Sequence, residues 1–256
     1  MANYTKKPEE IEIIREGGKI LGGILQRTAA LVKPGISTAE LNDFAEREII
    51  IAGGRPSFMG YGDRKNPFPA GLCTSINDAV VHGVPSAEDI LQEGDIIGLD
   101  IGMEYKDLFT DTAITVPVGK VSKRAELIIK TTKLALVEAI RLAKAGNRIG
   151  DMGFAMQSIA EKAGFSVVRD LVGHGVGYAV HEDPAVPCYG KAGTGLELVE
   201  GMVLAIEPMI CEKKPRVVYD SDGWTIRTSD GGLAAHFEHT IAITKKSARI
   251  LTAPNN

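Results

Sequence analysis

Cysteine is scarce in this sequence, and long apolar runs are missing from it. The chain has 3 cysteines among 256 residues, and their odd number and lack of CxxC spacing exclude a disulfide framework and a zinc knuckle. No apolar run approaches the ~20 residues that a membrane-spanning helix needs, and the polar segment 1–10 contains Pro8. We therefore expect a soluble, cytoplasmic protein with no membrane partner.

An excess of positive charge is also missing. The chain has 29 basic and 33 acidic residues, a net charge of −4, and both signs are mixed along its length. Binding to a phosphate backbone would require a basic stripe, so direct nucleic-acid binding is not expected. With 44% hydrophobic residues the chain can bury a full core, although its length alone leaves one domain or two open.

The sequence contains an internal repeat. Three pairs of segments recur in the same order: 31–54 with 142–165, 81–84 with 173–176, and 93–100 with 200–207. Each set reads as a helix that ends in glycine, a second helix, a His-Gly stretch and a strand that carries an acidic residue. We therefore predict one α+β domain, 1–256, with two halves, about 10–118 and 125–250, related by a pseudo-two-fold axis.

Two stretches rich in Ile, Val, Leu and Thr predict an antiparallel hairpin. They are 95–103 and 108–118, and a polar break separates them. With the turn centred at 105–106, Asp100 lies directly opposite Asp111, with Cβ atoms about 4.5–5.5 Å apart. Facing carboxylates repel unless protons or cations lie between them, so the alternative is that both side chains are solvent-exposed.

Other acidic and imidazole side chains interrupt apolar surroundings: His174 in GHGVG, Glu207 at a strand end and Glu238 in the last strand. A buried carboxylate must be neutralised or paired, and for Glu207 an ordinary salt bridge is the alternative. Together with Asp100 and Asp111, these residues form an oxygen-rich ligand set that suits Mn, Fe, Co or Zn. Four carboxylates balance the charge of two divalent ions better than that of one, which favours two metals.

Two other motifs are excluded. The GHGVG stretch lacks the GxGxxG spacing of a dinucleotide-binding loop. The segment 181–184, His-Glu-Asp-Pro, begins like the zincin motif HExxH, but position 185 is alanine and Pro184 would break the required helix.

Eight motifs resemble those of type I methionine aminopeptidases, which have the pita-bread fold, and the resemblance covers nearly all of residues 5–252. The motifs are SINDAVVHGVP, DIIGLDIG, FTDTA, GHGVG, VHEDP, IEPM, DGWT and FEHT. The resemblance implies an enzyme that removes the initiator methionine from nascent proteins when the second residue is small. It also implies attack on the peptide carbonyl by a hydroxide that two metal ions activate.

The same resemblance assigns roles to the ligand set. Asp100 would chelate one metal, His174 and Glu207 would hold the other or lie beside it, and Asp111 and Glu238 would bridge both. Glu207 would also carry the proton to the leaving nitrogen. The identity of the metal, Co, Mn, Fe or Zn, is left open.

Two histidines are implied to act on the substrate rather than to bind metal. His82 would contact the substrate near its amine and scissile amide, and His181 would donate a hydrogen bond to the carbonyl. His236 and His239 are expected to be ordinary strand residues. The methionine side chain would enter a pocket lined by Tyr61, Phe68, Cys73 and Trp224. The sequence departs from the family pattern at 63–67, which looks like an insertion, and at Val180, where the family has an aromatic residue.

Rival functions within the fold are a proline-specific or creatinase-like peptidase and a non-catalytic binding protein. The first normally carries a large additional N-terminal domain, for which we expect no room here, and the second has usually lost its ligands. No zinc-binding extension is expected before residue 1, which indicates a bacterial-like type I enzyme. We expect a monomer whose partners are the N-termini of nascent polypeptides, with the ribosome as a candidate partner.

Overall fold

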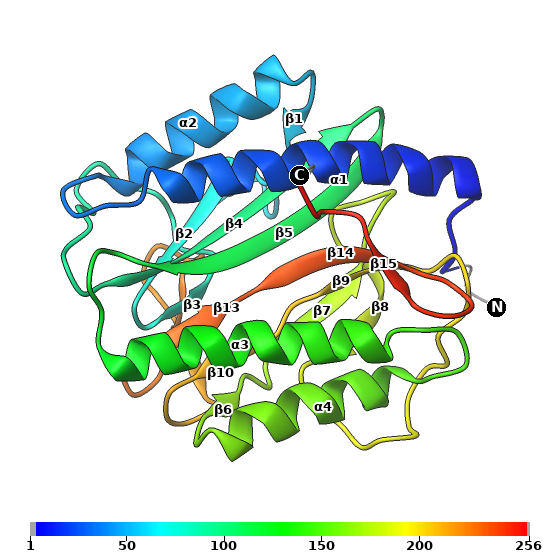
Figure 1. Cartoon of the computed structure of the whole chain (residues 1–256). Helices are drawn as coiled ribbons and strands as arrows, with labels where there is room; N and C mark the ends of the chain where they lie inside the picture. Colours follow the sequence, from blue (N-terminus) through cyan, green and yellow to red (C-terminus); the bar gives the residue numbers. More distant parts are fainter. Residues whose placement is uncertain (1–3, 255–256) are drawn as a thin grey trace.

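The computed structural model describes residues 4–254, which form a layer of four helices packed on β-sheet (Figure 1). The helices are α1 (Pro8–Ala30), α2 (Thr38–Ile51), α3 (Lys123–Leu142) and α4 (Ile149–Lys162). Helix α2 begins as its sequence dictates, since the Ser37 hydroxyl accepts from the Glu40 N–H and the Glu40 carboxylate accepts from the Ser37 N–H. No helix within residues 4–254 is both long and apolar enough to cross a membrane.

The main sheet has nine strands and is antiparallel at every pairing. Its path runs β1 (Arg55–Pro56), β4 (Ile96–Tyr105), β5 (Leu108–Pro117), β14 (Glu238–Ile243), β9 (Val203–Ile206), β7 (Val172–Gly175) and β8 (Glu182–Pro187), with β2 (Leu72–Ile76) on β4 and β15 (Ala248–Ile250) on β14. Two small sheets contain β6 (Ser166–Val167), β10 (Met209–Cys211) and β13 (Ala234–His236), and β3 (Ala79–Val81), β11 (Val217–Tyr219) and β12 (Ile226–Thr228). The α+β class is as predicted.

The two halves of the main sheet have equivalent strand orders. Strands β2, β4 and β5 pair in that order on one side, β7, β9 and β14 pair in that order on the other, and β5 meets β14 at the centre. The glycines after α1 and α3 occupy matching left-handed conformations, with φ of 89° at Gly35 and 88° at Gly146. Their N–H groups donate to Leu91 and Leu198 in equivalent bonds of 2.8 and 2.9 Å. The repeat is therefore visible in backbone geometry, while its exact extent, about 10–118 and 125–250, stays a prediction.

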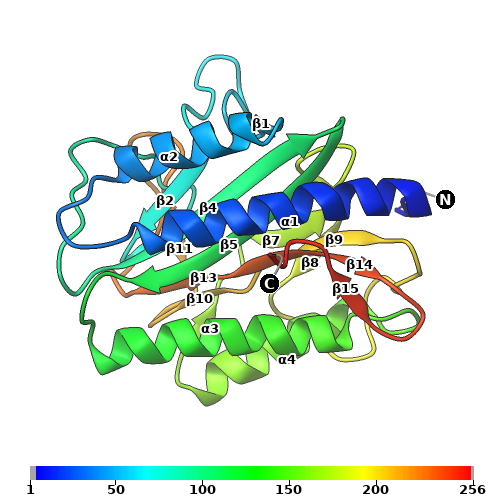
Figure 2. The ribbon, with the colours of Figure 1, turned by 45° about the horizontal axis from the view of Figure 1, so that its top comes forward.

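All four helices cover the same face of the sheet (Figure 2). Helices α1 and α2 bury leucines and isoleucines against one side of β4, on which Ile97, Leu99 and Ile101 lie. Helices α3 and α4 pack on each other and bury isoleucine, leucine, methionine and alanine side chains in one cluster with apolar side chains of β9 and β14. Because side chains alternate along a strand, Asp100 points to the opposite face. The helices thus leave the second face of the sheet for polar side chains.

The predicted hairpin is present, but its predicted register is wrong by two. Asp100 pairs with Ala113 and Asp111 pairs with Gly102, so the two aspartates are diagonal neighbours on one face. The cause is the turn, which is centred at Lys106–Asp107, both with positive φ (52° and 64°), as a two-residue turn of type I′ requires. Lys-Asp is a weak signal for this turn, whereas Asn-Gly would have fixed the register in the sequence.

Candidate functional site

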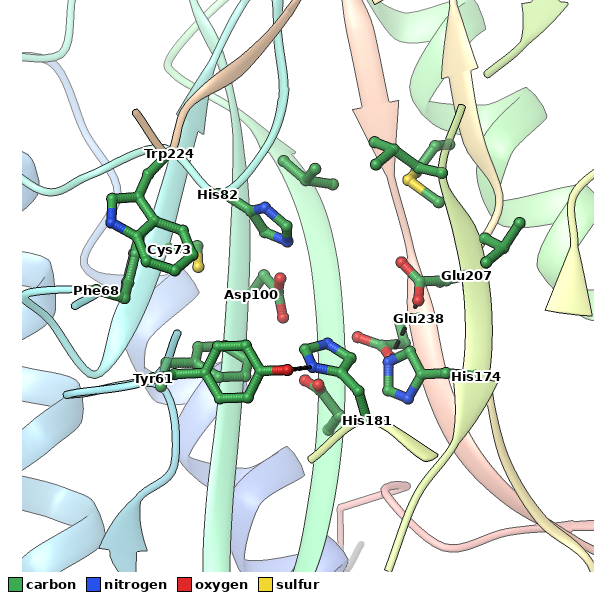
Figure 3. A pocket seen from close by; sticks show the side chains of 16 residues that line it. Tyr61, Phe68, Cys73, His82, Asp100, His174, His181, Glu207, Trp224 and Glu238 are labelled. Atoms are coloured by element: carbon green, nitrogen blue, oxygen red, sulfur yellow. Dashed lines mark hydrogen bonds and ion pairs between the residues drawn. The ribbon is translucent and has the colours of Figure 1, made fainter. Parts of the chain in front are cut away.

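Five predicted ligands converge on the face of the sheet that the helices leave open. They form the acidic cluster: Asp100 on β4, Asp111 on β5, His174 on β7, Glu207 directly after β9, and Glu238 on β14. Candidate ligand atoms lie within 4.8 Å of one another in the group Asp100, Asp111 and Glu238 and in the group His174, Glu207 and Glu238. In Figure 3, Asp100, Glu207, Glu238 and His174 point toward one shared space.

Threonines fix the central carboxylates. Few backbone pairs join β5 to β14, and the Thr240 hydroxyl instead accepts from the Asp111 N–H and donates to the Asp111 carbonyl, at 3.0 and 2.7 Å. The Thr112 hydroxyl donates to the Glu238 carbonyl at 2.9 Å. Thr112 of FTDTA and Thr240 of FEHT therefore hold together the two backbones that present the carboxylates.

His174 presents one defined ring nitrogen to the cluster. Its Nδ1 lies 2.9 Å from the Gly175 carbonyl oxygen, so Nδ1 is the donor to that carbonyl and Nε2 is the nitrogen turned toward the cluster. That Nε2 lies 3.4 Å from Oε1 of Glu207 and 4.0 Å from Oε1 of Glu238. A backbone carbonyl that orients the other ring nitrogen is the usual arrangement of a metal-binding histidine.

Burial and mutual repulsion raise the pKa values of three carboxylates in the cluster. Burial, and then the charges of Asp100 and Glu207, hold the pKa of Asp111 well above its usual value. Burial raises the pKa of Asp100 to about 6, and burial and Asp111 hold that of Glu238 far above normal. Asp100 Oδ1, Asp111 Oδ1 and Glu238 Oε1 have no hydrogen-bond partner within residues 4–254. Divalent cations would satisfy these oxygens and cancel the repulsion, so the residues present fit a metal centre.

His236 was expected to be an ordinary strand residue, and that prediction is wrong. It lies on β13, but its buried ring brings Nε2 to 3.2 Å from Oε2 of Glu207. Burial would lower the pKa of His236, and the contact with Glu207 outweighs this and raises it. Burial likewise would raise the pKa of Glu207, but His236 and His174 together lower it. Glu207 is therefore the one carboxylate of the cluster whose pKa its neighbours lower rather than raise. No local sequence signal indicated this contact, because it depends on the pairing of β13 with β10.

His239 does behave as expected. It lies on β14 between Glu238 and Thr240, and its Nδ1 is 2.9 Å from the hydroxyl of Thr252, away from the cluster. Alternation along the strand turns it to the face opposite Glu238.

A strained backbone aims His82 at the cluster. His82 follows β3 with φ of 58°, a left-handed conformation that is uncommon outside glycine. The next residue, Gly83, lies so close to β2 that an added Cβ would be 2.1 Å from the Thr74 carbonyl oxygen. The close approach of Gly83 to β2 thus directs the imidazole into the pocket (Figure 3), and burial lowers its pKa.

His181 lies across the pocket from His82. Its ring packs edge-on against the rings of His174 and Tyr61, with centroids 4.4 and 5.0 Å apart. Although the residue is exposed at the pocket mouth, this packing withdraws the imidazole from water and, with His174, lowers its pKa to about 4. His181 also groups with Asp111 and His174 within ligand distance, so geometry alone does not separate a metal ligand from a substrate contact.

The Tyr61 hydroxyl, 2.6 Å from Nδ1 of His181, leads to a first prediction. Because the imidazole is neutral at pH 7, a hydroxyl that donates to Nδ1 leaves the proton on Nε2, where it can be donated to a carbonyl. Tyr61→Phe should therefore lower kcat/KM by about 10-fold, less than loss of the imidazole itself. Steady-state kinetics would check this, and an unchanged kcat/KM would show that the hydroxyl does not set the tautomer.

The four predicted pocket residues, Tyr61, Phe68, Cys73 and Trp224, all line the pocket that contains the acidic cluster. Phe68 and Trp224 pack edge to face with centroids 5.3 Å apart. Burial, followed by the charge of Asp100, holds the pKa of the Cys73 thiol well above its usual value, so Cys73 is a neutral lining residue. The sequence analysis did not predict five further apolar residues that line the pocket: Phe58, Val81, Leu171, Val172 and Met209.

The segment 63–67, predicted as an insertion, lies against Trp224. The indole Nε1 donates to the Asn66 carbonyl at 3.1 Å, and the Asn66 amide donates to the Asp222 carbonyl at 3.1 Å. Val180 is 6% exposed and packs in the apolar cluster of Phe58, Phe68 and Cys73. The segment 63–67 and Val180 therefore both contact side chains that line the pocket, without lining it themselves.

Comparison with known proteins agrees with this geometry. The pattern of metallopeptidase family M24 matches residues 12–245. The methionine aminopeptidase of Clostridium acetobutylicum is 45% identical over 96% of this chain and 97% of its own length, and methionine aminopeptidase 1 of Bacillus subtilis is 44% identical over 96% and 98%. The crystal structure of the Thermotoga maritima methionine aminopeptidase superposes with a TM-score of 0.95 at 41% identity, covering 99% of this chain and 100% of that chain.

A more distant likeness bears on the fold alone. The prolidase of Pyrococcus furiosus superposes with a TM-score of 0.78 at 24% identity, and the match covers 99% of this chain but 66% of that one. The pita-bread fold expected from the motifs is thus confirmed, as is the resemblance to methionine aminopeptidases. From its sequence, its fold and the convergence of its acidic cluster, the chain belongs to metallopeptidase family M24 and, within that family, to the methionine aminopeptidases.

Proposed function

We propose that this enzyme removes the initiator methionine from nascent proteins whose second residue is small. The observation that carries the proposal is the acidic cluster at the bottom of an apolar pocket, because it combines a place for divalent ions with a place for a methionine side chain. Membership of a metallopeptidase family implies the use of divalent metal ions.

We propose that two divalent ions, Mn, Fe, Co or Zn, bind the acidic cluster. Asp100 would hold one ion, His174 and Glu207 the other, and Asp111 and Glu238 would bridge them. The repulsion among the carboxylates and their unpaired oxygens support this number of positive charges. When bound, the ions would lower the pKa of a water molecule, so that hydroxide can attack the scissile carbonyl, and would polarise that carbonyl.

The remaining steps belong to side chains of the protein. Glu207, whose pKa is lowered, would accept a proton and pass it to the leaving nitrogen. The Nε2 of His181 would donate a hydrogen bond to the carbonyl oxygen as negative charge develops there. His82 would contact the substrate near its amine and scissile amide. Tyr61, Phe68, Cys73 and Trp224 would surround the methionine side chain.

The second residue of the substrate sets the proposed selectivity. With the amine and the carbonyl held at the cluster, its side chain must point toward the loops that carry His82 and His181, where a long side chain would clash. Met-Ala-Ser should be cleaved at least about 10²-fold faster than Met-Lys-Ser, since a misplacement of about 1 Å can cost that much in rate. Release of methionine can be followed by chromatography, and comparable rates would contradict the proposal.

A proline-specific peptidase is the nearest rival activity. The same assay should include Ala-Pro peptides, which a proline-specific peptidase would cleave and this enzyme should leave intact. Because Val180 stands where the family has an aromatic residue, we also expect some cleavage of leucine or norleucine N-termini. The chain's own Met1-Ala2 start, an expected substrate, lies outside the described residues.

The cellular setting belongs to the same proposal. The N-termini of nascent polypeptides would be the partners of a monomeric enzyme in the cytoplasm, with the ribosome as a candidate site of action. Three free, buried cysteines fit a reducing compartment and support this setting.

A further inference from the structure

The segment 4–10 crosses the loop that carries His181, although the two are far apart in sequence. Its backbone is fixed beside the two residues that precede β9, since the Lys6 N–H donates to the Gly201 carbonyl at 2.8 Å and Thr5 forms a bridge with Met202. From this position the side chain of Lys6 reaches the loop 177–182.

Lys6 is a buried cation with a specific partner. Its side chain is 2% exposed, and Nζ lies 2.7 Å from Oε2 of Glu182. The same ammonium lies 4.4 Å from the centroid of the Tyr178 ring. The side chain of Lys6 can pass residue 177 because that residue is glycine. A Cβ added there would be 2.5 Å from Cε of Lys6. A lysine is almost never this buried unless it is paired, so these contacts account for its burial.

Glu182 uses its other oxygen to close the loop. Oε1 accepts hydrogen bonds from the backbone N–H groups of Tyr178 and Ala179, the latter at 2.8 Å. The Tyr178 hydroxyl donates in turn to Glu10 at 2.6 Å. The carboxylate of Glu182 thus joins the start of the loop 177–182 to its end, and the ammonium group of Lys6 neutralises its charge.

We propose that Lys6 and Glu182 are positioning residues for His181, which directly precedes Glu182 in the chain. The proposal rests on the proposed function, because it matters only if the His181 ring acts on the substrate. With Lys6 removed, the carboxylate of Glu182 would be left unpaired and would turn toward water, and the loop would shift with it. Neither residue lines the pocket, so any effect on turnover must pass through the loop.

The test compares Lys6→Met with Lys7→Met, a neighbouring lysine that is exposed. Lys6→Met should lower kcat/KM for Met-Ala-Ser by about 10-fold or more, mainly through kcat, with bound metal unchanged, because a loop shift of about 1 Å is enough for such a loss. Lys7→Met should match the wild type. An unchanged kcat/KM in Lys6→Met would overturn the proposal.

Two further variants distinguish positioning from general stability. Glu182→Gln in the Lys6→Met background removes the unpaired charge but keeps an oxygen for both N–H groups, so it should restore most of the activity, even if Lys6→Met alone folds poorly. In a His181→Ala background, Lys6→Met should cause little further loss, because residues that act through one group are not additive. Failure of the rescue, or a fully additive loss, would overturn the positioning role. A His181→Ala enzyme with full activity would instead refute the proposed function of His181, and the role of Lys6 with it.

Discussion

Asp111→Asn should abolish methionine release and remove metal from the protein. Asp111 lies at the centre of the acidic cluster, where its oxygens meet those of Asp100 and Glu238. Asparagine keeps the shape of the side chain but removes the negative charge that a bridging ligand must supply. The loss in kcat/KM should exceed the roughly 10–100-fold typical of losing a group that only orients a ligand.

Metal content and stability make this prediction specific. Elemental analysis should find less bound metal in Asp111→Asn than in Asp43→Asn, a matched substitution at an exposed site on α2. Chelation of the wild type should abolish activity in the same way. Because burial and neighbouring charges raise the pKa of Asp111, the metal-free variant should melt no lower than the metal-free wild type. Full activity and full metal content in Asp111→Asn would refute its role as a ligand.

His82→Ala and His181→Ala should fold and keep their metal, but lose about 10²- to 10³-fold in kcat/KM, the loss typical of a positioned hydrogen-bond donor or proton-transfer group. His174→Ala should lose metal as well, because its Nε2 faces the carboxylates of Glu207 and Glu238. Elemental analysis of the three variants therefore separates ligand from substrate contact. Metal-free His181→Ala protein would make His181 a ligand, which its proximity to Asp111 and His174 allows geometrically.

The sequence predicted the members of the acidic cluster because a buried carboxylate needs a cause, and several carboxylates in apolar strands need the same one. The repeat predicted their convergence, since Asp100 and Glu207 occupy equivalent positions in segments 93–100 and 200–207 of the two halves. The face of each residue was also predictable, because alternation along β4 and β5 survives a register error of two residues.

The features that the sequence analysis did not predict depend on contacts that have no local sequence signal. The turn at Lys106–Asp107 uses positive φ without glycine, so the direct pairing of Asp100 with Asp111 was wrong. His236 meets Glu207 only because β13 and β10 pair and bring the IEPM segment beside it. The pairing of Lys6 with Glu182 spans 176 residues, and no periodicity or motif could indicate it.

Anomalous diffraction from crystals grown with Mn²⁺ tests the central claim most directly. Two peaks should lie among the side chains of Asp100, Asp111, His174, Glu207 and Glu238, with His82 and His181 outside the coordination of both. Absence of a peak at the acidic cluster, or a single peak that leaves Asp100 or His174 unbound, would contradict the account.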